Sequence, residues 1–208
     1  NDGGSDGRTW DFTGQGEGLR NTIALRGRAG AQGLMHWSGN FDEVQDFEGQ
    51  IRNLAGGVGL MTNAAFNSGT RSQPLGDPKT GVSADLDALA AYVASLSLTP
   101  PSPYRLSDGS LTPSGVAGRN VFAAKDCGSC HQGSVFTDSQ LNVRHDVGTL
   151  TPSSGTRLGT PLDGLDTPTL KGVGATGPYL HDGSRTTLED AVNAHAGAFL
   201  TTQDLASL

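Results

Sequence analysis

Residues 127–131 read Cys127-Gly128-Ser129-Cys130-His131, the C-x-x-C-H pattern of covalent haem c attachment. In this pattern the two thiols form thioether bonds to the haem vinyl groups, and the adjacent histidine ligates the iron from one side. A zinc site is a weaker interpretation, because it needs about four ligands and the chain has only these two cysteines. A thioredoxin-like redox pair would need a βαβ setting, which the surrounding sequence does not indicate.

The composition around this motif predicts a loop-rich chain with modest helical cores. Among 208 residues there are 31 glycines, and only 35% of the residues are hydrophobic, so a haem would supply missing apolar bulk. The net charge of -7 argues against nucleic acid and anionic membranes as partners. The sequence contains no run of 18 apolar residues, so it predicts no transmembrane helix.

The sequence also indicates a compartment. It has no signal peptide and does not begin with Met, so we expect a processed form or a fragment. Attachment of haem c follows export in most bacteria, which predicts a periplasmic or extracellular protein.

Helices are predicted on both sides of the motif by caps and apolar periodicity. Thr112 and Pro113 begin a helix that runs to about Ala124 and delivers the chain to Cys127. The other predicted helices span about 41–54 after Asn40, about 84–98 after Ser83, and a last segment from Thr187 that includes His195. Residues 1–34 are predicted to be irregular.

A proline-rich stretch at residues 99–103 stops the helix before it and is typical of a stiff linker. We therefore predict a boundary there. Residues 1–100 would form a first lobe that lacks its own C-x-x-C-H motif, and residues 101–208 would form the haem-binding lobe.

Several runs outside the motif resemble the bacterial di-haem cytochrome c peroxidase and MauG superfamily. The strongest lie after the motif, at residues 166–173 (DTPTLKGV), 177–184 (GPYLHDGS) and 187–192 (TLEDAV). Weaker ones lie at residues 136–138, 145–149, 19–22 and 36–40. The resemblance implies a mostly α, cytochrome c-like fold of two lobes, with long loops and few strands.

This chain departs from the superfamily pattern in two places. Members carry one C-x-x-C-H motif in each domain, whereas this chain has one in all. A second haem is therefore expected only if an upstream segment exists; otherwise the variant has lost it. The resemblance also implies an acidic residue over the first haem of a peroxidase, but the matching run 56–61 (GGVGLM) has no carboxylate.

The distal iron ligand is predicted from the same resemblance. In the superfamily it lies on the helix after the 177–184 run, as Met in peroxidases and Tyr in MauG. The matching residue here is His195, which predicts His131/His195 ligation suited to low-potential electron transfer. The alternatives are that His195 is a surface histidine, or that Met35 or Met61 supplies a thioether ligand.

Other residues have two open interpretations each. The resemblance places Tyr179 and His181 in the haem pocket, although His181 can equally be a structural hydrogen-bonding residue. His145 either contacts a haem propionate or is an ordinary loop histidine. Trp37 or Trp10 either carries electrons between haems or packs in the core. Three cations either pair with propionates or are simply solvated: Arg119, Lys125 and Arg185.

Three functions remain open on the sequence alone. The first is an exported electron-transfer cytochrome that works with a redox partner or a neighbouring haem protein, including a multi-haem assembly. The second is a di-haem peroxidase or MauG-like oxidase whose catalytic haem is bound by a segment missing from this chain. The third is a haem-stabilised interaction module of a larger secreted protein.

Overall fold

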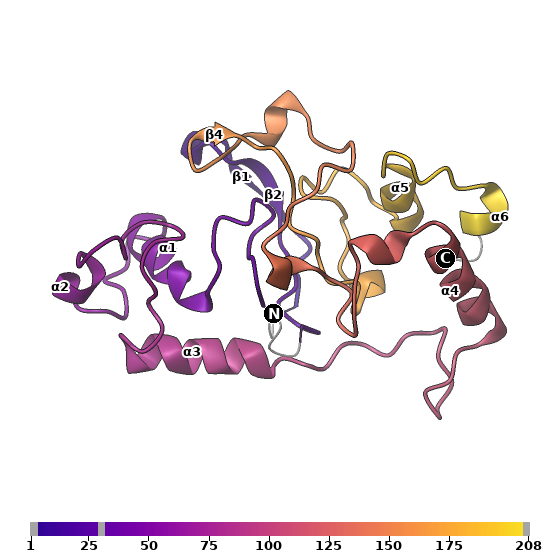
Figure 1. Ribbon diagram of the computed structural model, residues 1–208, viewed down its shortest axis with the longest axis horizontal. Coiled ribbons are helices and arrows are strands. Elements are labelled where there is room, and N and C mark those ends of the chain that lie inside the picture. The colour runs from indigo at the N-terminus through magenta and orange to yellow at the C-terminus, as the bar shows by residue number, and fades with distance from the viewer. Residues whose placement is uncertain (1–3, 29–31, 206–208) are drawn as a thin grey trace.

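The computed structural model describes residues 4–28 and 32–205. Helices supply most of the regular structure, the two antiparallel sheets are small, and loops form much of the remainder (Figure 1). The helices are α1 (Phe47–Asn53), α2 (Asn63–Phe66), α3 (Ala84–Ser95), α4 (Pro113–Ala124), α5 (Leu188–Asn193) and α6 (Thr202–Leu205). The sheets pair β1 (Thr9–Phe12) with β2 (Gly18–Asn21), and β3 (Thr156–Arg157) with β4 (Thr160–Pro161).

Three predicted helix starts are confirmed by the side chains that cap them. The hydroxyl of Ser83 accepts a hydrogen bond from Leu86 N at the start of α3. Thr112 and Thr187 do the same at the starts of α4 and α5, at 3.1 Å each. Each hydroxyl satisfies a backbone N–H that the first helical turn leaves without a partner.

Two predictions for the first half of the chain are wrong. The predicted helix 41–54 is a 3₁₀ turn, Val44–Asp46, followed by the shorter α1. Asn40 does not cap it, because its side chain contacts His36 and Glu17 instead. The stretch predicted as irregular, residues 1–34, contains the β1–β2 hairpin. The sequence pattern did not indicate this hairpin, because β1 is largely exposed and has no buried apolar face.

The apolar core lies in the N-terminal half, which we define as residues 1–100. One cluster contains Met35, Phe41, Val44 and Val93; the other contains Met61, Phe66 and Leu86. Helix α3 contributes to both clusters, as its predicted stripe requires. The C-terminal half, residues 101–208, differs: among its described residues only Leu165 and Ala191 are buried hydrophobics.

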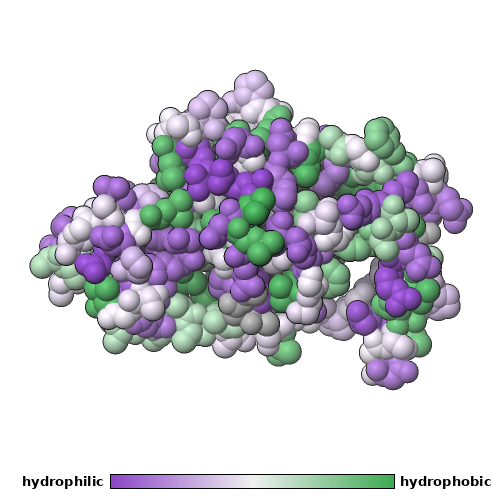
Figure 2. All heavy atoms as spheres, in the orientation of Figure 1, coloured by the Kyte–Doolittle hydropathy of each residue, from purple (hydrophilic) through white to green (hydrophobic). Residues whose placement is uncertain are grey.

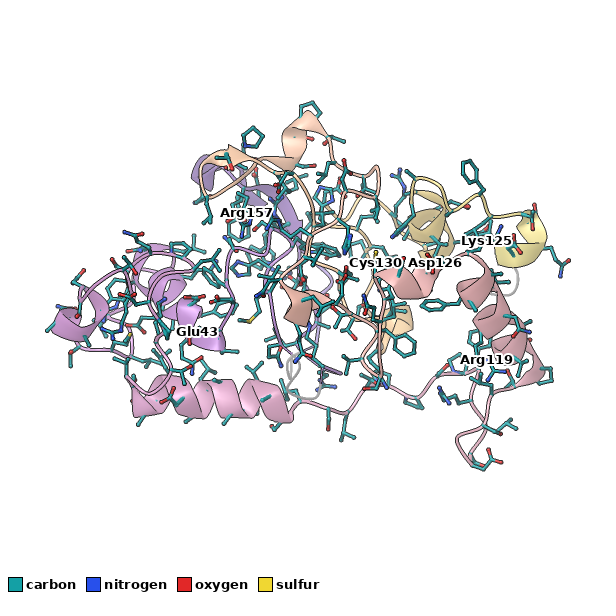
Figure 3. The ribbon with its side chains drawn as sticks, viewed as in Figure 1. Glu43, Arg119, Lys125, Asp126, Cys130 and Arg157 are labelled. Atoms are coloured by element: carbon teal, nitrogen blue, oxygen red, sulfur yellow. The ribbon has the colours of Figure 1, made fainter. Side chains whose placement is uncertain are left out.

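Residues 18–21 and 37–39 of the N-terminal half pack directly on the C-terminal half. Asn21 N donates to His181 O at 2.7 Å, and Asp166 N donates to Trp37 O at 2.9 Å. Arg157, labelled in Figure 3, donates from Nε to Ser38 O at 2.8 Å. The division near residue 100 stays a prediction, and these bonds tie the two halves along the backbone.

One close approach in this contact requires glycine. Gly155 has φ 77° and ψ −147°, a conformation reached essentially only by glycine. A Cβ there would lie 2.5 Å from the carbonyl carbon of Glu17. We expect Gly155→Ala to lower the free energy of unfolding by about 3 kcal/mol, combining backbone strain and overpacking. Urea denaturation measures this loss.

Gly159 provides the matched control for this substitution. It also has a positive φ, 83°, but a Cβ there would meet no heavy atom within 4 Å. Gly159→Ala should therefore cost only the backbone strain, about 1 kcal/mol. Equal losses in the two variants would contradict the close approach at Glu17.

A search of the described residues finds no helix with both the length and the apolar character needed to cross a membrane.

Candidate haem-binding site

The C-x-x-C-H segment forms a tight turn directly after α4. Asp126 adopts a left-handed conformation with φ 54°, and Cys127–Ser129 is a 3₁₀ turn. His131 N donates to Cys127 O at 3.0 Å and closes the turn. Both cysteines are free and half-buried, and Figure 3 shows Asp126 and Cys130 between α4 and the body of the molecule. One turn of chain therefore holds both thiols and the imidazole.

The hydrogen bond of the His131 ring fixes its tautomer. Nδ1 lies 3.2 Å from the carbonyl oxygen of Phe136. A carbonyl oxygen only accepts, so Nδ1 carries the proton and Nε2 of the neutral ring keeps its lone pair. Burial lowers the pKa of His131, the carbonyl of Phe136 opposes this shift, and His195 adds to it. The ring is therefore neutral near pH 7, the form that ligates metals.

His195 has the same arrangement just after α5. Its Nδ1 lies 2.9 Å from the carbonyl oxygen of Ala191, which again leaves the lone pair on Nε2. The next residue anchors the segment, because Ala196 N donates to Val147 O at 2.8 Å. Ligation of one iron by His131 and His195 stays a prediction.

The apolar surroundings of this turn fit a haem. Helix α4 has no fully buried side chain, and its Val116 and Phe122 are only half-buried. Phe122 also contacts Phe136 edge to face, with ring centroids 6.1 Å apart. Figure 2 shows an opening between the α4 segment and the body of the molecule. A haem supplies apolar surface to cover residues of this kind.

The contacts of Tyr179 and His181 described below are with residues outside the 127–131 turn. The Tyr179 hydroxyl donates to Val173 O at 3.2 Å. His181 is fully buried, its Nε2 lies 2.8 Å from the hydroxyl of Ser154, and its ring meets Trp37 at 6.5 Å. Burial lowers the pKa of His181. These contacts give His181 a structural hydrogen bond where the two halves meet, and a haem contact for either residue stays a prediction.

A sulfur–oxygen–nitrogen cluster lies beside the turn. One ligand atom each of Cys130, Asp138 and His145 lies within 4.8 Å of the others. His145 Nε2 is 2.7 Å from Asp138 Oδ2, and the buried Oδ1 of Asp138 has no hydrogen-bond partner. Such a set could hold a thiophilic cation only while Cys130 is a free thiol. The sequence analysis named the segments that contain these three residues, but it did not predict that the residues lie close together.

The remaining predicted residues divide by exposure. The sulfurs of Met35 and Met61 belong to buried side chains of the two core clusters. Trp10 is 46% exposed, whereas Trp37 is half-buried and donates from Nε1 to Asn21 O at 2.8 Å. Arg119 and Arg185 are exposed, and Lys125 pairs with Asp204 at 3.3 Å.

A carboxylate that the sequence analysis missed reaches the 56–61 run. Glu48 on α1 is fully buried and accepts from Leu60 N at 2.8 Å and from Arg52 Nε at 2.6 Å. Burial alone would raise the pKa of Glu48, but these donors and Met61 N lower it overall. The spacing of Glu48 and Arg52, four residues apart on a helix, could have predicted their ion pair. The Glu48 carboxylate already accepts hydrogen bonds from Arg52 and from the backbone of the 56–61 run, so its role is structural.

Comparison with known proteins gives two kinds of relative. No family model matches the chain. Hydrazine synthase subunit gamma from Kuenenia stuttgartiensis is 34% identical over 145 residues, which cover 52% of this chain. The matched part spans only 40% of that curated relative.

Solved structures give broader coverage. The structure of Kuenenia stuttgartiensis hydrazine synthase pressurised with 20 bar xenon matches 100% of this chain and 76% of that chain, with a TM-score of 0.63 and 26% identity. A MauG-like protein associated with microbial copper homeostasis matches 91% of this chain and 71% of its own, with a TM-score of 0.55 and 17% identity. The second likeness shows the fold alone. Together these neighbours show that the chain shares its fold with a hydrazine synthase chain and with a MauG-like protein.

Proposed function

We propose that this chain is an exported c-type cytochrome that transfers electrons through one haem, bonded to Cys127 and Cys130 and ligated by His131 and His195. The observation that carries the proposal is the matched tautomer of the two imidazoles. Each has Nδ1 committed to a backbone carbonyl, at 3.2 Å and 2.9 Å, and so presents Nε2 as the ligand atom. Metal-ligating histidines commonly donate their other N–H in this way.

The surrounding residues would position the group and keep its ligands fixed. A bound haem c supplies reversible one-electron chemistry at its iron. The Phe136 and Ala191 carbonyls hold the two rings in orientation. If both imidazoles ligate the iron, they would leave no coordination site for peroxide. An imidazole pair also lacks the thioether that raises the potential of Met/His haems. These features favour electron transfer at low potential.

The setting of the protein is part of the proposal. The relative of 34% identity is named as a subunit, which supports a place beside other redox proteins in an assembly. A redox partner or neighbouring haem protein would exchange electrons with the 127–131 region, whose cysteines are half-buried rather than enclosed. Haem c attachment supports a periplasmic or extracellular location.

Intact mass and visible spectra of the purified protein test the proposal. We expect the mass of one covalently bound haem, an acid-acetone extraction that leaves this haem on the chain, and a low-spin ferric spectrum unchanged by cyanide. A colourless protein of bare polypeptide mass would contradict the function. A covalent haem with a high-spin spectrum would instead contradict the His131/His195 pair.

A second candidate function is an oxidoreductase with its reactive group in the N-terminal half. The observation that favours it is a cavity of about 610 Å³ there, within the range of about 300–1,000 Å³ typical of cofactor sites. The names hydrazine synthase and MauG-like, carried by the structural neighbours, agree with this class. Peroxide-dependent spectral change that persists while the covalent haem stays low-spin would support this candidate.

A further inference from the structure

Three segments of the C-terminal half bring a thiol, a carboxylate and an imidazole to one place. Cys130 follows the 3₁₀ turn after α4 (Figure 3). Asp138 lies at the start of the next 3₁₀ turn, and His145 pairs with Leu165 in an isolated β-bridge. One ligand atom each of Cys130, Asp138 and His145 lies within 4.8 Å of the others. These are the three ligand types that zinc takes in proteins.

Backbone hydrogen bonds hold two of these side chains on fixed segments. His145 N donates to Leu165 O at 2.9 Å, and Leu165 N donates to His145 O at 2.8 Å. Leu141 N donates to Asp138 O at 2.7 Å. Little chain ordering is therefore required to collect the ligands, and preorganisation of this kind favours binding.

The Asp138 carboxylate is buried and only partly satisfied. Its side chain is 2% exposed, and its Oδ2 lies 2.7 Å from His145 Nε2. The other oxygen, Oδ1, is buried and has no hydrogen-bond partner. Buried carboxylate oxygens normally have a partner, so Oδ1 is an unused ligand atom in the cluster.

The cluster also lacks a fixed positive charge. Asp138 and Arg28 line the same cavity, of about 350 Å³, but Arg28 forms its ion pair with Asp166 at 3.3 Å. In the described part of the chain, the ion pair that Asp138 makes is with His145. A divalent cation would balance the charge of this carboxylate together with that of a Cys130 thiolate. The cavity has room for a water ligand, since one water occupies about 30 Å³.

We propose that the chain with free thiols binds one divalent cation of the zinc class through Cys130 Sγ, the Asp138 carboxylate and His145 Nε2, with water as a further ligand. The cation replaces the proton that His145 and Asp138 share. Their ligand atoms, now 2.7 Å apart, would then lie about 3.3 Å apart, the spacing of tetrahedral ligands about 2.0–2.1 Å from the metal. This proton and the thiol proton pass to solvent.

The inference goes beyond the proposed haem and does not rest on it. It gives the free thiol of Cys130 a use that ends when the sulfur becomes a thioether, because the sulfur that binds zinc is a thiolate. The cation and a covalent haem therefore exclude each other at this one atom. The second thiol, that of Cys127, is not part of the cluster.

Titration of the haem-free full chain with Co²⁺ tests the proposal. The chain made without haem attachment and kept reduced should bind one Co²⁺, with the thiolate-to-cobalt charge-transfer band and the visible bands of a four-coordinate site. Added Zn²⁺ should displace the Co²⁺ and remove these bands. The chain that carries covalent haem should bind no Zn²⁺ in isothermal titration calorimetry.

Matched substitutions identify the ligands. Cys130→Ser should remove the charge-transfer band. His145→Ala should weaken Co²⁺ binding by at least about tenfold, because loss of a ligand costs no less than loss of a residue that orients one. Cys127→Ser is the thiol control and Asp146→Asn the carboxylate control; both residues lie outside the cluster, and both variants should bind Co²⁺ as the unchanged chain does. Zn²⁺ should raise the unfolding temperature of the haem-free chain but not that of Cys130→Ser.

Four outcomes would overturn the proposal: no Co²⁺ binding by the haem-free chain, a charge-transfer band that survives in Cys130→Ser, unchanged binding in His145→Ala, or loss of the band in Cys127→Ser. The last result would assign the metal to the two cysteines of the turn. Zn²⁺ binding by the chain with covalent haem would equally contradict the assignment of Cys130. Absence of covalent haem from the exported protein would count only against the proposed function.

Discussion

Replacing His195 by alanine is expected to convert a six-coordinate, low-spin haem c into a five-coordinate haem that binds cyanide and carbon monoxide. The reason is that His195, the predicted distal ligand, presents Nε2 from a ring fixed by the Ala191 carbonyl. Removal of the imidazole leaves one axial ligand, and small molecules then reach the iron. Visible absorption and electron paramagnetic resonance measure the change of spin state.

Two further variants make this test specific. His36→Ala should leave the spectrum of the covalent haem unchanged, because that ring lies in the cavity of the N-terminal half and bonds Asn40. His195→Met should stay low-spin and raise the reduction potential, since a thioether ligand favours the ferrous state. A His195→Ala protein with an unaltered spectrum would mean that another residue supplies the distal ligand.

Arg28→Met should cause the largest loss of stability, about 3–5 kcal/mol at pH 8, because it leaves a buried carboxylate without its cation. Arg28 pairs with Asp166 at 3.3 Å, and the two side chains are 3% and 0% exposed. Arg28 also donates to Leu34 O at 3.1 Å. This pair joins the two halves of the chain, and urea denaturation of the purified protein gives the loss.

The loss of stability caused by Arg28→Met should be smaller in acid than at pH 8. The pKa of Asp166 is raised from 3.8 to about 6. Burial causes this increase, and the positive charge of Arg28 opposes part of it. Without Arg28 the carboxyl has a still higher pKa, so the folded chain holds a proton that the unfolded chain releases near pH 3.8. Stability therefore rises as the pH falls from above 6 toward 4. Arg28→Met should recover part of its loss at pH 5.

Arg144→Met is the matched control. Its ion pair with Asp163 is shorter, 2.8 Å, but the Asp163 side chain is 71% exposed. Exposed pairs contribute less than about 1 kcal/mol, because water already solvates both charges. A loss in Arg144→Met as large as that in Arg28→Met would show that burial does not decide the cost.

Local rules predicted the elements whose causes lie within a few residues. Ser83, Thr112 and Thr187 cap α3, α4 and α5 through hydroxyl oxygens that reach the third residue of each helix, and short-range geometry is enough for that. The predicted helix at 41–54 is wrong because Asn40 does not cap it. The Asn40 side chain instead donates to Glu17, which lies 23 residues earlier in the sequence.

The sequence by itself predicted haem attachment, because the pattern of Cys127, Cys130 and His131 lies within a single turn of chain. Only the tertiary structure decided which distant side chains meet. It joined Arg28 to Asp166, and it aligned Glu17, Asn40 and His36 in one cavity wall. The physical reason is that burial, tautomer and charge pairing depend on contacts between segments far apart in sequence, which no local pattern records.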